Sequence, residues 1–192
     1  MIDGSVILAE ALEALNIDLT RLVARCSIWV NPDVFSRVAA LNQNAVWYPD
    51  TRRARAGKVD EIKGTKSQDG IIFDDNSKAN TAIKQAIFPK ANKGCTGMAV
   101  CHIWPNTCYD ERYHTALGNL VLLPAPLASL TDHHTEIKLV LRFRSYELFG
   151  WHPAEFARPE QPKQYPPAEV WASPITVDRA VEQRIKRLER RL

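Results

Sequence analysis

The sequence lacks several features that would place it in a special class of protein. No apolar run approaches the roughly 20 residues of a transmembrane helix. The first fifteen residues contain Asp3, Glu10 and Glu13, and they have no basic region of the kind that opens a secretory signal. The four cysteines form no C-x-x-C pair and are too few for a disulfide framework in 192 residues. We therefore expect reduced thiols in a cytoplasmic protein that does not enter a membrane.

The composition is that of an ordinary globular chain. Hydrophobic residues make up 45% and charged residues 24%, which is enough for a normal core and argues against disorder. The net charge of +3 is too small to indicate nucleic acid by itself. However, residues 51–70 hold six basic side chains against three acidic ones, and so do the last seventeen residues. Together these two clusters favour an anionic partner.

The patterning divides the chain into three parts. Residues 1–94 read as a helical N-terminal part with a basic arm at about 49–70. Helices are expected at 5–15, with Ser5 as the cap, at 19–24, and after Asn31-Pro32, where an asparagine cap precedes a proline in the first helical position. A helix-turn-helix is possible here, but plain helical packing is the more frequent reason for such an arrangement.

Further elements are expected along the rest of the chain. They are a strand at 70–73, a helix at 77–88, strands at 98–104 and 119–123, helices at 125–131 and 135–149, and a basic helix at 176–191. Residues 151–192 hold a proline-rich segment that should wrap around the domain, anchored by Trp151, Phe156, Tyr165 and Trp171. The predicted fold class is α+β, with a core at 95–150.

Chemistry-bearing residues concentrate in that core. Four of the five histidines lie between residues 102 and 134. His102 lies on the first strand, Asn119 opens the second, and Asp132-His133-His134 lies on or just after the first helix. Histidine suits a general base because its ordinary pKa of about 6.5 leaves it mostly neutral at physiological pH.

This region resembles the HNH family of nucleases, whose active site is a ββα-metal finger. The resemblance rests on His102 in H-I-W-P, on Asn119 in N-L-V-L-L-P and on the Asp-His-His run, and it covers about residues 95–150. It implies metal-dependent hydrolysis of phosphodiester bonds in double-stranded DNA by a restriction or defence enzyme. His102 would be the base, Asn119 would orient it, and Asp132 and His133 would hold the metal.

The same interpretation names cofactor and partners. The metal would be a divalent cation, Mg or Mn first and Zn or Ni as alternatives, because hard cations favour oxygen ligands. The phosphate contacts would come from the arm, through Arg52, Arg53, Arg55 and Lys58, and their contribution would be electrostatic. A homodimer is compatible with this interpretation.

Two alternatives remain open at this point. Cys95, Cys101, Cys108 and His114 could hold a structural zinc, although their intervals are wrong for paired knuckles. The chain could also be a non-catalytic nucleic-acid-binding module on the same scaffold, because Cys101 and Ala128 occupy positions where many HNH nucleases carry metal ligands. If no zinc is bound there, we expect His114 to be a loop residue. His152 should be structural. For His134 two roles stay open, a cap for the helix that follows it or a metal ligand within the Asp-His-His run.

Overall fold

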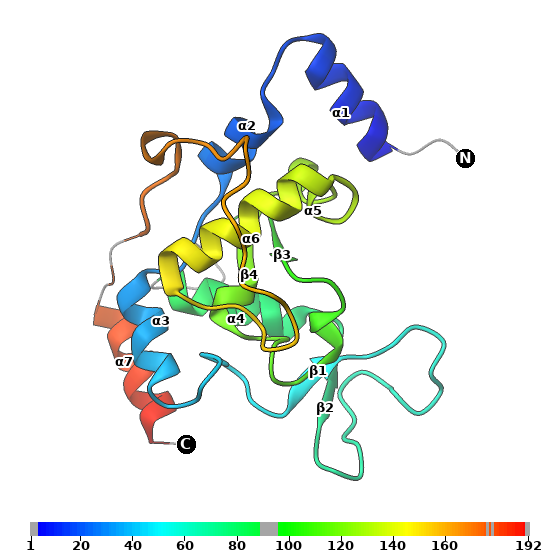
Figure 1. Cartoon of the computed structure of the whole chain (residues 1–192). Coiled ribbons are helices and arrows are strands. Elements are labelled where there is room, and N and C mark those ends of the chain that lie inside the picture. Colours follow the sequence, from blue (N-terminus) through cyan, green and yellow to red (C-terminus); the bar gives the residue numbers. More distant parts are fainter. Residues whose placement is uncertain (1–3, 89–95, 176, 178, 191–192) are drawn as a thin grey trace.

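The computed structural model describes residues 4–88, 96–175, 177 and 179–190 and shows a mixed α and β protein built from short elements (Figure 1). In chain order the described helices and strands are α1 (Gly4–Ala14), α2 (Leu19–Cys26), α3 (Pro32–Ala39), β1 (Thr51–Arg53), β2 (Ile72–Asp74), α4 (Ser77–Ile87), β3 (Met98–His102), β4 (Leu120–Pro124), α5 (Leu130–His133), α6 (Thr135–Phe149) and α7 (Arg179–Glu189). The mixed α and β architecture predicted from the sequence is confirmed.

An antiparallel pair of strands lies at the centre of the molecule. β3 pairs with β4, so that Met98 faces Pro124 and His102 faces Leu120. The leucines and valine of β4 are fully buried, which is the pattern of a central strand covered on both faces. α5 and then α6 follow β4 directly, and α6 lies beside the pair (Figure 1). The predicted order of strand, loop, strand and helix is therefore found.

Local signals explain where two of the helices begin and end. The Asn31 side chain accepts a hydrogen bond from the Asp33 backbone at 2.9 Å, and Pro32 is the first residue of α3. α6 ends at Gly150, whose positive φ of 63° lets it accept the left-handed conformation that stops a helix. Both helices were predicted, α3 from its Asn31-Pro32 start.

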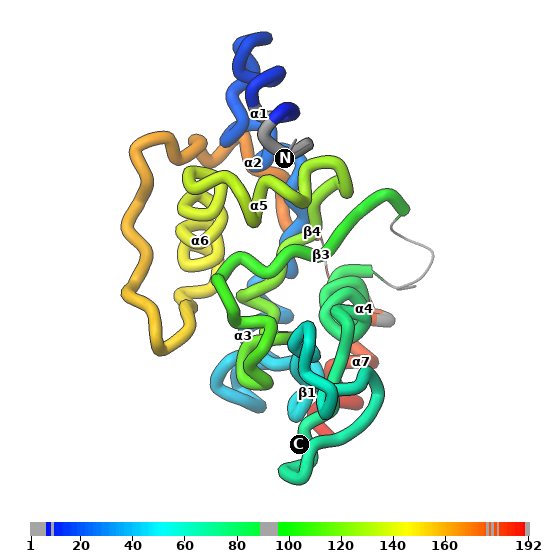
Figure 2. The backbone as a smooth tube through the Cα atoms, turned by 90° about the vertical axis from the view of Figure 1, so that its right-hand side faces the viewer, coloured from blue at the N-terminus to red at the C-terminus, as the bar shows by residue number. Residues whose placement is uncertain are grey.

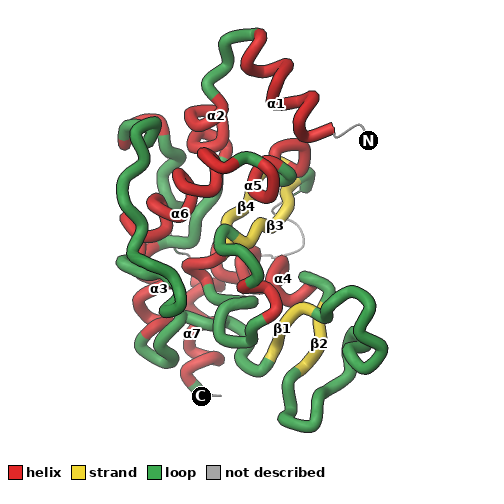
Figure 3. The backbone as a smooth tube through the Cα atoms, turned by 45° about the vertical axis from the view of Figure 1, so that its right-hand side comes forward, coloured by secondary structure: helices red, strands yellow, loops and turns green. Residues whose placement is uncertain are grey.

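Three predicted elements differ from the structure. α1 begins at Gly4, so Ser5 lies inside the helix and is not its cap. The helix expected at 125–131 is a short 3-10 turn at Ala125–Leu127 followed by α5. The arm at 49–70 contains β1, which was not predicted because its partner β2 lies about twenty residues further along the chain. β1 and β2 form a separate parallel pair (Figure 3).

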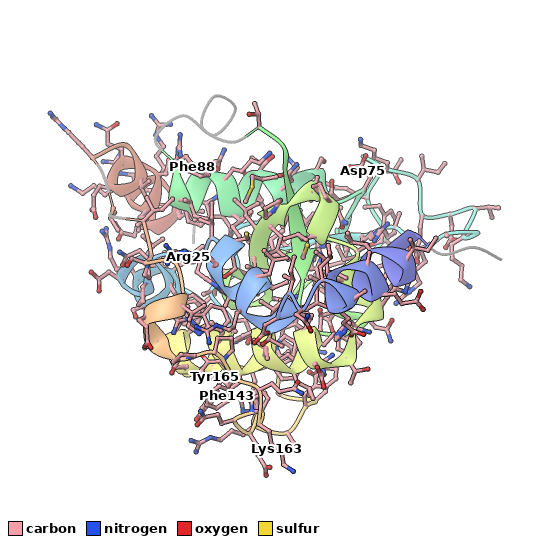
Figure 4. All side chains as sticks on the ribbon, turned by 90° about the horizontal axis from the view of Figure 1, so that it is seen from above. Arg25, Asp75, Phe88, Phe143, Lys163 and Tyr165 are labelled. Carbon is pink, nitrogen blue, oxygen red and sulfur yellow. The ribbon has the colours of Figure 1, made fainter. Side chains whose placement is uncertain are left out.

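The proline-rich segment after α6 covers the outer side of that helix (Figure 2). Trp151 and Trp171 are buried, and Phe156 and Tyr165 pack against the core, so the four predicted anchors all contact it. The ring of Tyr165 lies 4.8 Å from that of Phe143 on α6 (Figure 4).

The wrap also approaches the second strand of the central pair. A Cβ added to Gly118 would lie 2.7 Å from the Trp151 ring, closer than two such atoms can stand. Only glycine fits at this contact, and it immediately precedes Asn119. The start of the proline-rich segment therefore packs directly against the backbone that leads into the candidate site.

A single core joins the three parts that the sequence suggested. Val181, Ile185 and Leu188 of α7 belong to the same buried cluster as the central strand β4, and α7 packs on α3 and α4. In the part of the chain that the structure describes, no helix is both long enough and apolar enough to cross a bilayer.

Candidate active site

The His102 ring ends β3 and is held by the loop that follows. Its Nε2 atom lies 2.9 Å from the carbonyl oxygen of His114. A carbonyl only accepts hydrogen bonds, so Nε2 carries the ring hydrogen of neutral His102 and Nδ1 keeps its lone pair. Nδ1 has no hydrogen-bond partner among the described residues and is not buried. His102 therefore has the form in which a histidine accepts a proton from a bound molecule.

The surroundings of His102 keep it neutral. Burial, reinforced by the neighbouring His114, lowers the pKa of His102 from 6.5 to about 3. The two rings are nearly parallel, with centroids 5.3 Å apart and an angle of 12° between their planes. A proton on His102 would be poorly solvated and close to the second imidazole. The ring thus stays neutral over a wider pH range than an ordinary histidine, and in the free protein it binds a proton more weakly.

Asn119 is fully buried and fixes the loop between the two strands of the pair. Its Oδ1 accepts from the Trp104 backbone at 3.3 Å, and its Nδ2 donates to Thr107 Oγ1 and to the Tyr113 carbonyl, each at 2.9 Å. Tyr113 directly precedes His114, whose carbonyl holds His102. Asn119 therefore acts on His102 through the loop backbone.

The structure separates the residues of the predicted metal cluster. Asp132 lines the same cavity as His102, whereas the neighbouring His133 does not line it and is exposed to solvent. Successive residues of a helix point about 100° apart, which explains the separation. His134 occupies the N-cap position of α6, one of the two roles left open for it, but its side chain makes no capping hydrogen bond. Of the three, only Asp132 is placed to act together with His102.

A cavity of about 410 Å³ opens beside His102 and carries mostly positive charge. Arg53, Lys138 and Arg142 line it, and Asp132 is its one acidic lining residue. None of the three cations forms an ion pair with a residue that the structure describes. The Arg142 guanidinium donates to the Ile103 carbonyl at 3.0 Å, and burial lowers its pKa. The cavity is suited to an anion that brings its own negative charge.

The arm residues predicted to contact phosphate have different surroundings. Arg52 makes two hydrogen bonds to the Glu61 carboxylate, at 2.8 and 2.9 Å, and Arg55 adds a third at 3.1 Å. Mainly because of Arg52, the pKa of Glu61 falls to about 2. Arg53 instead lines the cavity, and Lys58 is exposed. Arg53 is therefore the arm residue that the fold brings to His102.

The thiols do not gather around a metal in the described residues. Cys95 lies outside them, so the complete zinc set proposed above has no structural description. Burial raises the pKa of the Cys101 thiol to about 11, and its sulfur contacts the Ala128 carbonyl. His114 Nε2 is bound to Asp74. Among the described residues no group of three or more histidine, cysteine, aspartate or glutamate side chains is arranged to hold a metal ion.

Comparison of the chain with protein-family models, with curated proteins and with solved structures finds no match. The geometry of the site therefore carries the functional argument.

Three residues of the site, Asp74, Lys138 and Arg142, were not singled out from the sequence as site residues. Lys138 and Arg142 are four residues apart on α6, and this spacing could have shown that they share one face of the helix. Asp74 and His114 are 40 residues apart, and nothing in the local pattern connects them.

Proposed function

We propose that this protein is a metal-dependent endonuclease that hydrolyses phosphodiester bonds in double-stranded DNA, on a ββα-metal core of the HNH type. The observation that carries the proposal is His102 itself. Its Nε2 is bound to a carbonyl, its Nδ1 is accessible, and it lines a cavity that holds one carboxylate and three cations without an ion pair to any described residue.

This arrangement matches the needs of phosphodiester hydrolysis. His102 Nδ1 takes a proton from water, the water oxygen bonds to phosphorus, and the bond from phosphorus to one ester oxygen breaks. Negative charge grows on the phosphate oxygens during this step, and Arg53, Lys138 and Arg142 are placed to stabilise it. The phosphate also favours the protonated imidazole that forms beside it, which offsets the low proton affinity of His102 in the free protein.

A divalent metal ion fits one side of this site. Asp132, the carboxylate that lines the cavity, would supply an oxygen ligand, and Mg²⁺ is commonly held by one or two carboxylates together with water and substrate phosphate. When bound, the metal would supply further stabilisation of charge on the phosphate and the leaving oxygen. The exposed His133, the second ligand expected from the sequence, would be left without a role.

Two aspects of the substrate belong to the same proposal. The cations of the cavity recognise phosphate charge and carry no sequence information, so the choice of duplex DNA and a restriction or defence role follow from the family resemblance alone. Cutting both strands would require two such sites, which a homodimer would provide.

One observation favours a second candidate function. Asp132 is the single carboxylate on the cavity wall, and Cys101 precedes His102 where many HNH nucleases have a metal ligand. A cavity that binds phosphate but holds no metal would make the protein a non-catalytic nucleic-acid-binding module. The two candidates differ in whether the phosphodiester bond breaks.

Incubation of supercoiled plasmid with the purified protein, with and without Mg²⁺ or Mn²⁺, tests the proposal. We expect nicked and linear products that require the metal, and a loss of about 10²- to 10⁴-fold in rate for His102→Ala, the usual contribution of a general base. DNA affinity of this variant should change little. His133→Ala is the control, because this exposed histidine lies outside the cavity.

Two results would contradict the proposal. If the wild-type protein binds plasmid but leaves it uncut with every divalent metal, the binding module becomes the better account. If His102→Ala cuts within about tenfold of the wild-type rate, His102 is not the base, because that loss is below the usual range.

A further inference from the structure

The residue that holds His102 is itself held by a buried carboxylate. His114 is fully buried, and its Nε2 lies 3.0 Å from Oδ2 of Asp74, the last residue of β2. Asp74 is also buried, with 3% of its surface exposed. Because a carboxylate accepts hydrogen bonds, His114 Nε2 must carry a hydrogen. Asp74 lies in the N-terminal part, well outside the region that resembles a nuclease.

Asp74 is firmly placed by the start of α4. Its carboxylate accepts from the Ser77 hydroxyl at 2.6 Å and from the Lys78 backbone at 2.8 Å. Burial raises the pKa of Asp74, but the hydrogen bonds from His114, Ser77 and the backbone outweigh this and bring it well below its usual range. A buried charge that keeps its ionised form needs such partners. The ionised carboxylate is therefore held in one place, and its hydrogen bond with the His114 ring holds that ring.

His114 meets His102 in two ways at once. Its ring lies parallel to the His102 ring at 5.3 Å, and its own backbone carbonyl accepts the hydrogen of His102 Nε2. Rotation of the His114 peptide would remove the only described acceptor of that hydrogen. Tying down the His114 side chain therefore limits both the place of the His102 ring and the choice of which nitrogen carries its hydrogen.

We propose that Asp74 and His114 are positioning residues that keep His102 in the form with hydrogen on Nε2 and a free lone pair on Nδ1. The link to cleavage rests on the proposed function, whereas the state of the His102 ring does not. The competing explanation is that Asp74 only caps α4. Under that explanation the loss of Asp74 would lower stability and leave the His102 ring as it is.

Ser77 supplies a matched control for this distinction. Its hydroxyl donates to Oδ1 of Asp74, whereas the His114 ring contacts Oδ2. Ser77→Ala removes a hydrogen bond from the same carboxylate and leaves the contact with His114. A second comparison is Asp74→Asn, whose amide oxygen can still accept from His114 Nε2 but carries no charge.

The experiment measures the His102 ring directly in the full-length protein. Long-range ¹H–¹⁵N correlation spectra of histidine-labelled protein distinguish protonated from unprotonated ring nitrogens. In the wild type, His102 should show hydrogen on Nε2. Asp74→Ala should give a mixture of the two neutral forms, Asp74→Asn should keep mainly the Nε2 form, and Ser77→Ala should match the wild type.

Cleavage assays on the same variants add a second readout. Asp74→Ala should lower kcat about tenfold with KM within about twofold, because a misplaced base slows the chemical step more than it weakens binding. Asp74→Asn should lie between Asp74→Ala and the wild type, and Ser77→Ala should cleave normally. Thermal unfolding of each variant is measured alongside, to show whether kcat follows stability. If Asp74→Asn recovers part of kcat without recovering stability, the effect comes from the position of His102.

Two results would overturn the inference. The first is a wild-type His102 with hydrogen on Nδ1, which needs no variant to fold. The second is a folded Asp74→Ala protein whose His102 keeps the Nε2 form. If the spectra follow the expectation while no variant or wild-type sample cuts DNA, the proposed function fails and the positioning role stands.

Discussion

Two neighbouring arginines show how differently the fold can use the same side chain. Arg52 and Arg53 are adjacent in β1, where successive side chains point to opposite sides. Arg52 turns to Glu61 and is almost fully covered, with 13% of its side chain exposed, whereas Arg53 lines the cavity beside His102. The first cation is neutralised inside the protein and the second is available to a ligand.

The comparison extends to the clusters around each arginine. The Glu61 cluster, formed by Arg52, Arg55 and Glu61, carries its own carboxylate between two cations. The cavity combines Arg53 with Lys138 and Arg142 and has Asp132 as its one acidic lining residue. A count of basic residues in a segment of sequence therefore does not show which of them can meet a phosphate. Whether a basic residue can meet a phosphate depends on whether a carboxylate lies next to it in the folded structure.

The largest effect should come from the adjacent arginines themselves. Arg52→Ala should lower the free energy of unfolding by about 2 kcal/mol, because it leaves the buried Glu61 carboxylate with only part of its hydrogen bonding. Arg53→Ala should change the free energy of unfolding by less than about 0.5 kcal/mol, as is usual for an exposed residue. Chemical denaturation of both variants measures the difference.

DNA binding should depend on Arg53 and not on Arg52, the reverse of the effect on stability. Arg53→Ala should flatten the dependence of log affinity on log salt concentration by about one unit, the value for one lost phosphate contact. Arg52→Ala should leave that slope unchanged. A flattened slope for Arg52→Ala and an unchanged one for Arg53→Ala would reverse the roles we assign to them.

A lysine from the cavity and a lysine from the arm give a second comparison, with a smaller expected free-energy change. Lys138 lines the cavity, whereas Lys58 is exposed in the arm. Lys138→Gln should lower kcat/KM for DNA cleavage about tenfold, or 1.4 kcal/mol, because it removes one charge from the surroundings of the reacting phosphate. Lys58→Gln should stay within about twofold, as expected for a screened surface charge. Equal losses for both would mean that the cavity has no special role.

Lowering the pH should reduce the stability that the cavity region contributes by about 1 kcal/mol and leave that of the Glu61 cluster unchanged. The folded pKa of His102 is lowered from 6.5 to about 3, so between these values the unfolded chain binds a proton that the folded chain does not. Stability contributed by neutral His102 is complete above pH 6.5 and falls as the pH drops. From pH 7 to pH 5.5 the free energy of unfolding should therefore fall by about 1 kcal/mol.

The Glu61 cluster should not respond in that interval. Its carboxylate has a folded pKa of about 2 against 4.5, so its contribution persists above pH 4.5 and is lost only as the pH falls towards 2. Denaturation at pH 7 and pH 5.5 should thus show a loss in the wild type that is smaller in His102→Ala. An equal loss in both proteins would assign the pH dependence to another group.

The parts of the fold that were predictable from the sequence depend on local interactions. α6 was expected at 135–149 and has those bounds, and it ends where Gly150 adopts the left-handed conformation. α3 was expected from Asn31-Pro32, an asparagine cap followed by a proline in the first helical position, and it begins there. Among the site residues, His102, Asn119 and Asp132 stood out because they lie in one continuous stretch that resembles a known motif.

The remaining parts depend on contacts between distant residues. The parallel pairing of β1 with β2 places Arg53 opposite Asp74, and Asp74 contacts His114. The residues near either strand give no local signal that predicts this pairing. The same limit applies to Arg52, because its partner Glu61 closes a loop whose shape the sequence does not show. His133 was chosen together with Asp132 because both follow Asn119 at a distance where the HNH resemblance implies a metal ligand, and the turn of the helix separates them.

The place of α7 in the shared core has a consequence for the timing of synthesis. α7 packs on α4, α4 begins at the residues that bind Asp74, and Trp151 closes over Gly118 next to Asn119. A ribosome therefore delivers His102 and Asn119 after Asp74 and α4 but before Trp151 and α7. The unfinished chain would lack the part of the core that Trp151 and α7 complete. Under the proposed endonuclease function, DNA close to the site of translation would meet a fully packed site only after α7 has emerged.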